Sequence, residues 1–90
     1  MLVHKCYNIY MYYLYLFRCR DKTLYCGVTN NLLNREKRHN SGRGAKYTRN
    51  HGPGKIVYSE HFSTLSQAMR REVEVKKFPK LKKEKLISRK

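Results

Sequence analysis

Two strand-like segments joined by a short polar turn place the tightest limit on how this chain can fold. Residues 12–19 read YYLYLFRC, and residues 23–28 read TLYCGV. Both segments are rich in the aromatic and branched residues that favour β-strands. The turn between them, Arg20-Asp21-Lys22, is polar and leaves room only for a tight reversal. Residues 12–28 are therefore predicted to form an antiparallel hairpin.

The rest of the chain alternates between helical and extended patterns. Asn30 and Thr64 are residue types that cap helices, and Gln67 follows Thr64 at the spacing of a capping box. The patterns predict a helix over 31–39, a long basic loop over 41–54, a strand over 55–62, and helices over 65–77 and 80–90. The predicted order is ββαβαα, an α+β fold in which a small three-stranded antiparallel sheet is flanked by helices.

The 90 residues of the chain are enough for one compact domain. The patterned sequence begins at Met11, which is also a credible alternative start. We expect a flexible N-terminal extension over residues 1–10 and a single domain over residues 11–90. No apolar run reaches the roughly 18 residues that a membrane-spanning helix needs, and the N-terminus lacks the apolar core of a signal peptide. We therefore expect a cytoplasmic protein, with a monomer as the default state.

The charge balance indicates the partner. The chain has 21 Lys and Arg residues against 6 Asp and Glu, a net charge of +15. So basic a domain repels itself unless it binds a polyanion, and nucleic acid is the usual one. An anionic membrane surface is the alternative, but it calls for a basic amphipathic helix with Trp or Phe on its apolar face. The chain has no Trp, and its basic C-terminal stretch is only weakly apolar. We therefore predict that the partner is nucleic acid.

The small number of acids limits the chemistry that an active site can use. A two-metal nuclease needs several convergent carboxylates, and 6 acids spread along the chain hardly supply them. The sequence also lacks the GxSxG motif of serine hydrolases and the phosphate-binding loops GxxxxGK[ST] and GxGxxG. Its 3 cysteines form no CxxC pair, which argues against both a disulfide framework and structural zinc. An enzyme of this composition uses at most one metal-binding carboxylate.

Glu72 is the acid that stands out. A helical projection of residues 65–77 gives an apolar face made of Leu65, Ala68, Met69, Val73 and Val75. Glu72 falls near the middle of that face, whereas Glu74 points nearly the opposite way. A carboxylate directed at the core must pair with a cation, bind a metal or border an opening. The residues alone leave a structural salt bridge and a functional acid equally open.

Arg35 and His39 form a second candidate pair. They stand four positions apart and therefore share one face of the predicted helix. A guanidinium holds a phosphate through two parallel hydrogen bonds, and an imidazole can donate or move a proton. The alternative is an ordinary solvated face of a charged helix.

Tyrosines crowd the predicted hairpin. On its first strand Tyr13 and Tyr15 should share one face, with Leu14 and Leu16 on the other. Aromatic residues in such a pattern usually serve packing. In a basic protein they can also stack on nucleic-acid bases.

Taken together, these fragments resemble the GIY-YIG nuclease superfamily. Tyr13-Leu14-Tyr15 and Tyr25-Cys26-Gly27 are similar to the paired GIY and YIG triplets on its first two strands, although the first triplet keeps only its tyrosine and Cys26 replaces the usual isoleucine. Arg35 is similar to the family's helix arginine, and Glu72 to its single metal-binding glutamate. The resemblance covers about residues 11–90, and it is strongest to small bacterial one-domain members of uncharacterised function.

The resemblance implies a metal-dependent DNA endonuclease that hydrolyses phosphodiester bonds, with structure-specific cleavage as one form of the activity. Glu72 would hold one Mg²⁺ or Mn²⁺, and Arg35 would neutralise charge on the phosphorus. Tyr15 or Tyr25 would orient and help deprotonate water, with His39 as a candidate proton shuttle. The resemblance leaves the choice of base open among these last three residues.

The resemblance also implies binding and structural roles. Gly27 would be structural, and the basic loop would contact nucleic acid through Lys46, Tyr47, Thr48 and Arg49. Two other functions remain open at this point. One is a non-catalytic module that binds DNA or structured RNA, and the other is a domain that works only with a protein partner that supplies specificity.

Overall fold

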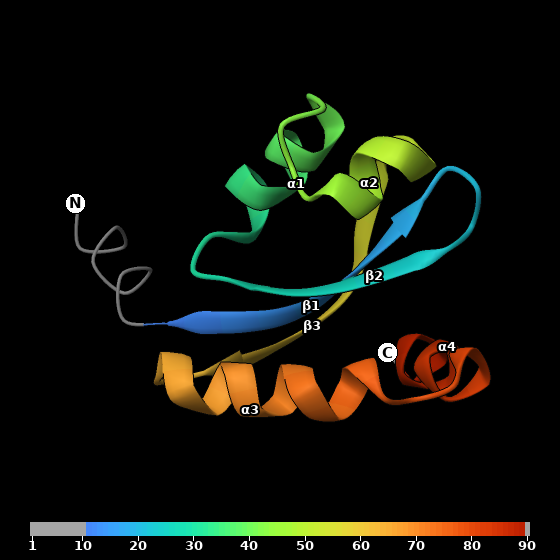
Figure 1. The fold of residues 1–90 in the computed structure, drawn as a ribbon. Helices are drawn as coiled ribbons and strands as arrows, with labels where there is room; N and C mark the ends of the chain where they lie inside the picture. The colour runs from blue at the N-terminus through green and yellow to red at the C-terminus, as the bar shows by residue number, and fades with distance from the viewer. Residues whose placement is uncertain (1–10, 90) are drawn as a thin grey trace.

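The computed structural model describes residues 11–89, which form a three-stranded antiparallel sheet with helices on both faces (Figure 1). The elements are β1 (Tyr12–Cys19), β2 (Leu24–Thr29), α1 (Leu32–Asn40), α2 (Lys46–His51), β3 (Gly54–Phe62), α3 (Leu65–Lys76) and α4 (Lys80–Ser88). The α+β class, the hairpin and the antiparallel sheet flanked by helices are confirmed. The extension predicted for residues 1–10 lies outside the described residues.

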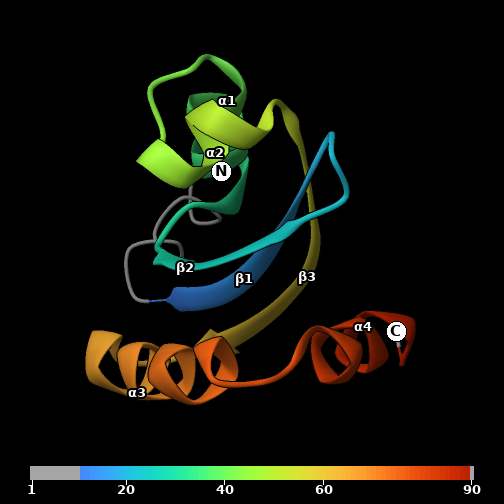
Figure 2. The same ribbon diagram turned by 45° about the vertical axis from the view of Figure 1, so that its right-hand side comes forward.

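The sheet has the strand order β2-β1-β3, so β1 is the central strand. Both neighbours run antiparallel to β1, with Tyr15 opposite Gly27 on one side and Ser59 on the other. An irregularity interrupts the pairing with β3 between Leu16 and Phe17. Figure 2 shows the strands twisting strongly across the sheet. β2 is an edge strand, so side chains from the two faces of the sheet can lie close to each other beyond its outer edge.

The two faces of β1 are buried against different helices (Figure 1). Leu14 and Leu16 are 0% exposed and pack in a cluster that includes Val75 of α3. Tyr15 and Phe17 point the other way and pack in a second cluster that Leu32 of α1 joins. Side chains alternate along a strand, so this single strand supplies both halves of the core.

Polar side chains fasten α1 to β3. The Asn40 amide donates to the Gly54 carbonyl at 2.9 Å and accepts from the Gly54 N–H at 2.8 Å. One turn earlier, the Glu36 carboxylate accepts from the Ile56 N–H at 2.8 Å. These bonds satisfy backbone groups at the start of β3 and hold the helix that carries Arg35 at a set height above the sheet.

Arginine–carboxylate pairs fasten the helices on the other face. Arg71 of α3 donates two hydrogen bonds to the Glu60 carboxylate, at 2.9 and 3.0 Å. Arg18 of β1 donates two to Glu84 of α4, at 2.8 and 2.7 Å. Bidentate pairs of this kind restrict orientation as well as distance. The Arg71–Glu60 pair therefore sets the rotation of α3 immediately before Glu72.

The helix ends differ from the predictions at several points. Asn31, rather than Asn30, caps α1, and its side chain accepts from the Asn34 N–H at 3.0 Å. The capping role of Thr64 is confirmed by its bond from the Gln67 N–H at 3.2 Å. Helix α4 ends at Ser88. Within residues 11–89, no helix has the length and apolar character needed to cross a membrane.

The predicted basic loop contains a short helix. Residues 46–51 form α2, where the glycine-rich sequence had indicated only irregular structure. Distant contacts explain the difference, because Thr48 is buried against α1 and Tyr47 packs against Tyr25 of β2. Such tertiary contacts stabilise a short helix that is too short to form alone.

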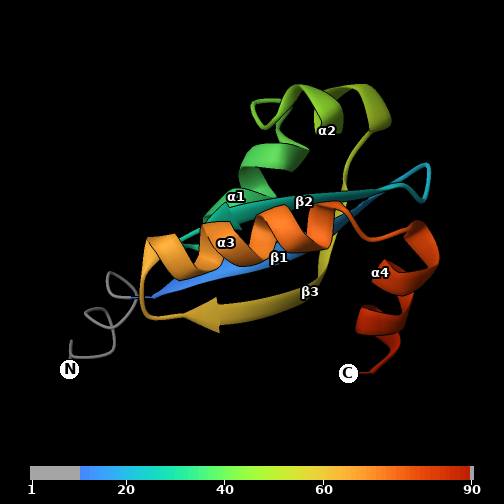
Figure 3. The same cartoon turned by 60° about the horizontal axis from the view of Figure 1, so that its bottom comes forward.

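The predicted apolar face of α3 is wrong in part. Ala68 and Val75 are buried, but Leu65, Met69 and Val73 are exposed by 45, 49 and 56%. Figure 3 shows α3 lying along the sheet beside β1 and β2. Only the narrow face with the small residues fits against the strands in this orientation. Glu72 therefore lies at the border between the buried and exposed sides of the helix, not at the centre of the buried one.

We expect Leu16→Ala to lower the free energy of unfolding by about 2–5 kcal/mol, because it leaves a cavity in the wholly buried centre of β1. Leu81→Ala is the matched control, since Leu81 is 70% exposed and the same atoms are removed. Urea denaturation followed by circular dichroism measures both. Equal losses in the two variants would contradict the assignment of the core.

Candidate active site

Tyr15 lies at the centre of the candidate site. Its side chain extends from β1 toward α1 and is only 2% exposed. The Tyr15 hydroxyl oxygen is 2.8 Å from Nε2 of His39. The ring lies directly against Gly27 on the neighbouring strand, where a Cβ atom would come within 2.6 Å of that oxygen. A larger residue at position 27 would therefore displace the phenol.

A chain of hydrogen bonds continues from His39 into α2. Nδ1 of His39 is 2.8 Å from the Thr48 hydroxyl oxygen, and that hydroxyl donates to the Ala45 carbonyl at 2.9 Å. Since the Thr48 proton is used on Ala45, the Thr48 oxygen must accept from Nδ1–H. Nε2 is then the unprotonated nitrogen and accepts from Tyr15. The direction of every hydrogen bond in this series thus follows from the Ala45 carbonyl, which accepts the Thr48 proton.

Burial keeps both Tyr15 and His39 uncharged. It raises the pKa of Tyr15 well above its usual value, and the nearby Tyr25 raises it further, while the positive charge of Arg35 opposes both. It also lowers the pKa of His39, as do the charges of Arg35 and Arg38. At neutral pH the pair therefore consists of a neutral phenol that donates and a neutral imidazole that accepts.

Arg35 and Glu72 approach Tyr15 from opposite faces of the sheet. Arg35 lies on α1 and Glu72 on α3, and the charges of both act on the pKa of Tyr15. The Glu72 side chain is 20% exposed and pairs with Nζ of Lys76 at 3.3 Å. Such a half-exposed pair within one helix is weak, so a stronger cation can replace Lys76.

Tyr25 completes the cluster on the side of α2. Its ring centre is 6.3 Å from that of Tyr15, 5.4 Å from that of His39 and 5.7 Å from that of Tyr47. Tyr25 is half-buried. Tyr15, Tyr25 and His39 are thus brought together by direct contacts, and Arg35 and Glu72 are near enough for their charges to act on the pKa of Tyr15.

The four residues predicted to contact nucleic acid have separate environments. Lys46, Tyr47 and Arg49 lie on the surface of α2, and the Tyr47 ring stacks on His51 at 4.2 Å between centres. Thr48 differs from the prediction, because it is 1% exposed and its hydroxyl is bonded to His39. It faces the interior of the site and not a ligand in solvent.

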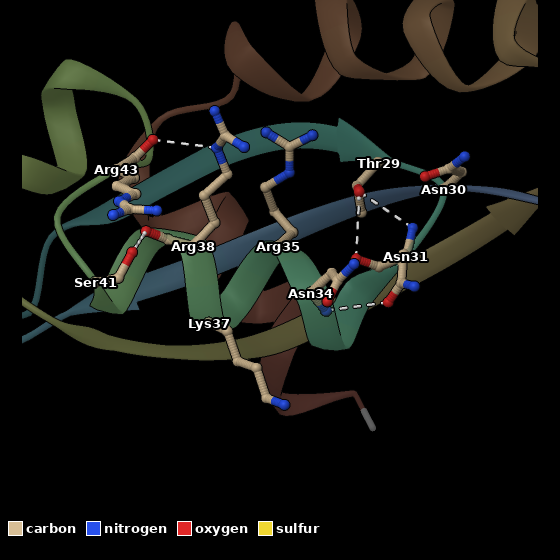
Figure 4. Close-up of a pocket in the computed structure, with 9 residues that line it drawn as sticks. All are labelled: Thr29, Asn30, Asn31, Asn34, Arg35, Lys37, Arg38, Ser41 and Arg43. Atoms are coloured by element: carbon tan, nitrogen blue, oxygen red, sulfur yellow. Dashed lines mark hydrogen bonds between the residues drawn. The ribbon is translucent and has the colours of Figure 1, made fainter.

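A cavity of about 450 Å³ opens beside Arg35 on α1. Figure 4 shows the side chains of Arg35 and Arg38 extending next to each other from α1, and Arg43 on the turn that follows also lines the cavity. Arg38 and Arg43 were not among the predicted site residues. The spacing of three between Arg35 and Arg38 was a usable indication, because such residues are neighbours on a helix. Nothing local indicated Arg43.

The donor set for a metal ion is small. No group of three or more His, Cys, Asp or Glu side chains gathers anywhere in the described part of the chain. Mg²⁺ commonly keeps several waters and binds one or two carboxylates together with substrate phosphates. A single, partly exposed carboxylate at Glu72 fits that mode and does not fit a cage built by the protein alone.

Comparison with known proteins places this geometry in a family. The model of the GIY-YIG catalytic domain matches residues 11–85. The chain belongs to the GIY-YIG nuclease superfamily. The matched residues include Tyr15, Tyr25, Arg35 and Glu72.

Several GIY-YIG relatives are similar over most of their length. The chain is 47% identical over 76 residues to UPF0213 protein OB0043 of Oceanobacillus iheyensis, covering 84% of this chain and 88% of that one. It is 50% identical over 80 residues to UPF0213 protein CPE1444 of Clostridium perfringens, covering 89% and 86%. The solution NMR structure of UPF0213 protein BH0048 from Bacillus halodurans matches with a TM-score of 0.57 and 44% identity, covering 89% of this chain and 85% of that one. The predicted resemblance to small bacterial one-domain members is confirmed.

We expect Thr48→Val to destabilise the protein by about 1–3 kcal/mol, because the shape is kept but Nδ1–H of His39 is left buried without an acceptor. Thr48→Ser keeps the hydroxyl and should recover most of the loss. Urea denaturation at neutral pH measures the series. Equal stability of the valine and serine variants would contradict the hydrogen-bond chain.

Acid should destabilise the fold through His39. Its pKa in the folded state lies below its ordinary value of about 6.5, so as the pH falls below 6.5 the unfolded chain binds a proton that the folded chain does not. The free energy of unfolding of the wild-type protein should therefore decrease as the pH falls through this window. The His39→Gln variant should show a smaller decrease over the same window. His61→Gln is the control, because His61 is exposed. Denaturation curves across the window give the comparison, and an equal pH dependence in both variants would overturn it.

Proposed function

We propose that the protein is a metal-dependent DNA endonuclease that hydrolyses one phosphodiester bond per event. The observation that carries this proposal is the buried Tyr15–His39 bond, at 2.8 Å, in the neighbourhood of both Arg35 and Glu72. A purely structural pair would not need a guanidinium and a carboxylate from opposite faces of the sheet. Membership of the nuclease superfamily supports the same reaction class.

The proton relay explains how a phenol with a raised pKa takes part in catalysis. The water oxygen forms a bond to phosphorus as the bond to the leaving oxygen breaks. The water proton passes to the Tyr15 hydroxyl oxygen while the Tyr15 proton passes to Nε2 of His39, and the leaving oxygen takes a proton from solvent. Tyr15 therefore never has to exist as a stable phenolate, and the base at the end of the relay is His39. This geometry favours Tyr15 over Tyr25 as the residue that contacts the attacking water.

Arg35 and Glu72 supply the electrostatic part of the mechanism. The Arg35 guanidinium would stabilise the charge that develops on the phosphate oxygens. Glu72 would exchange Lys76 for one Mg²⁺ or Mn²⁺, which polarises the phosphate when it is bound. Tyr25, next to Tyr15, would help to orient the water. The exposed cations Lys46 and Arg49 on α2 would hold the backbone of the nucleic acid without reading its sequence.

The substrate range follows from the kind of contact that is proposed. The proposed contacts are to phosphate, and contacts to phosphate carry no direct sequence information. We therefore propose structure-specific cleavage of cytoplasmic DNA, such as nicked, flapped or branched duplexes, by a monomer or by a complex in which a protein partner selects the target.

A non-catalytic nucleic-acid-binding module is the second candidate function. The ion pair between Glu72 and Lys76 favours it, because this pair neutralises the carboxylate without a metal. In such a module, binding to DNA or structured RNA would depend on the charge of +15 alone and would weaken steeply with salt.

Glu72→Gln should reduce cleavage by at least about 100-fold, because mutation of even an outer-shell partner of a metal ligand costs about 10–100-fold. Affinity for the same substrate should be retained. Glu74→Gln is the matched control, because Glu74 lies two residues further on α3 and is 60% exposed in its side chain. Nicked, flapped and branched duplexes are incubated with Mg²⁺ or Mn²⁺, and products are separated on denaturing gels.

Two results would count against the endonuclease. Cleavage by Glu72→Gln at the wild-type rate would remove the carboxylate from the mechanism. Absence of cleavage by the wild-type protein on every substrate, together with tight salt-sensitive binding, would favour the non-catalytic module.

A further inference from the structure

Three arginines surround the cavity beside α1. Arg35, Arg38 and Arg43 all line it, together with Lys37 and with neutral polar residues of which Thr29, Asn30 and Asn34 are examples. Figure 4 shows the guanidinium groups of Arg35 and Arg38 side by side over β2. The proposed cleavage mechanism uses Arg35 alone, so it assigns no function to Arg38 or Arg43.

The turn after α1 positions Arg38 and Arg43 relative to each other. Gly42 has a positive φ of 83°, which reverses the chain at the end of the helix. The Arg43 N–H then donates to the Arg38 carbonyl at 3.1 Å, and Nε of Arg38 donates to the Arg43 carbonyl at 3.1 Å. This reciprocal pair holds the Arg38 guanidinium in place through Nε. Its terminal N–H groups are left to face a ligand.

None of the Asp and Glu side chains, all of which lie within residues 11–89, neutralises these arginines. Each of the 6 acids in the sequence has a partner elsewhere. Asp21 pairs with His51, Glu36 with the Ile56 N–H, Glu60 and Glu74 with Arg71, Glu72 with Lys76, and Glu84 with Arg18. Gathering like charges without a counter-charge is unfavourable unless an anion binds among them. The charges of Arg35 and Arg38 are also felt inside the fold, where both lower the pKa of His39.

The spacing of Arg35 and Arg38 along α1 indicates what kind of anion would bind. Residues three apart on a helix have Cβ atoms about 5–6 Å apart. Phosphates along one DNA strand follow each other at about 3.4 Å of helix axis, whereas the major groove is about 12 Å wide. Because the guanidiniums of Arg35 and Arg38 lie side by side, they suit neighbouring phosphates of one strand better than phosphates on opposite sides of the major groove.

We propose that Arg38 and Arg43 form a second phosphate-binding site, which holds the phosphate next to the scissile one on the same strand. The proposal rests on the proposed function in one respect, because it takes the phosphate at Arg35 as the scissile one. Its consequence is that α1 and the turn after it fix the register of the cleaved strand. The contact is to the backbone and is independent of base sequence.

Binding is measured without divalent metal, so that cleavage does not enter. The probe is a fluorescent single-stranded oligonucleotide of mixed sequence, titrated over a series of salt concentrations. Arg38→Gln should weaken binding by about 10-fold and reduce the slope of log affinity against log salt by about one. Arg70→Gln is the matched control, since Arg70 is exposed and lies two residues before Glu72, on the far side of α3. Equal effects of the two substitutions would show only general electrostatics and overturn the site.

A neutral methylphosphonate placed at one position at a time identifies the phosphate concerned. The probe for this scan carries a single flapped junction, which sets the register. Wild-type protein should lose affinity when the phosphate bound by Arg38 is replaced, and Arg38→Gln should show no further loss at that position. Arg35→Gln should become insensitive at the adjacent position instead. The proposal is overturned if Arg38→Gln remains as sensitive as wild type at every position, or if both variants become insensitive at the same position.

The outcome separates this proposal from the nuclease itself. If the scan gives two adjacent positions but no substrate is cleaved with Mg²⁺ or Mn²⁺, the second phosphate site stands and the catalytic function fails. If cleavage depends on Glu72 but the scan gives no position for Arg38, the nuclease stands and the second site is rejected. Urea denaturation of each variant confirms that the compared proteins are folded.

Discussion

The burial of β1 on both of its faces is the constraint on which the rest of this structure depends. A domain of this size has a thin core, and here one strand supplies side chains to both halves of it. Tyr15 is therefore a core residue and a site residue at once. A buried phenol requires a hydrogen-bond partner, and His39 meets that need. The requirement for folding and the proposed proton relay are satisfied by the same bond.

The distribution of charge has an equally simple logic. The few acids mainly stabilise the packing of helices on the sheet. Glu60 and Glu84 bind arginines that join α3 and α4 to the strands, and Glu36 accepts from the backbone of β3. The cations are in large excess, and those beside α1 have no carboxylate to bind. Arg35 and Glu72 therefore act on the pKa of Tyr15 in a protein that is strongly positive overall. This excess of positive charge suits an anionic polymer better than a small neutral ligand.

Much of the fold could be predicted because its information is local. The hairpin, β3 and the cap at Thr64 follow from patterns a few residues long, and the spacing of Arg35 and His39 places them on one face of α1. The apolar face of α3 was misplaced because hydrophobicity alone does not set the rotation of a helix. The bidentate pair between Arg71 and Glu60 does so, and it turns Met69 outward. Helix α2 was missed because its stabilising contacts come from distant residues.

The sequence by itself determined the element order, the excess of positive charge and the set of residues that could do chemistry, because alternation, capping and spacing are properties of neighbouring residues. Only the tertiary structure decided how those residues work together. The direction of the Tyr15–His39 bond depends on Thr48, which reaches His39 from another helix. An imidazole can place its proton on either nitrogen, and the neighbour that selects one of them is brought close by folding.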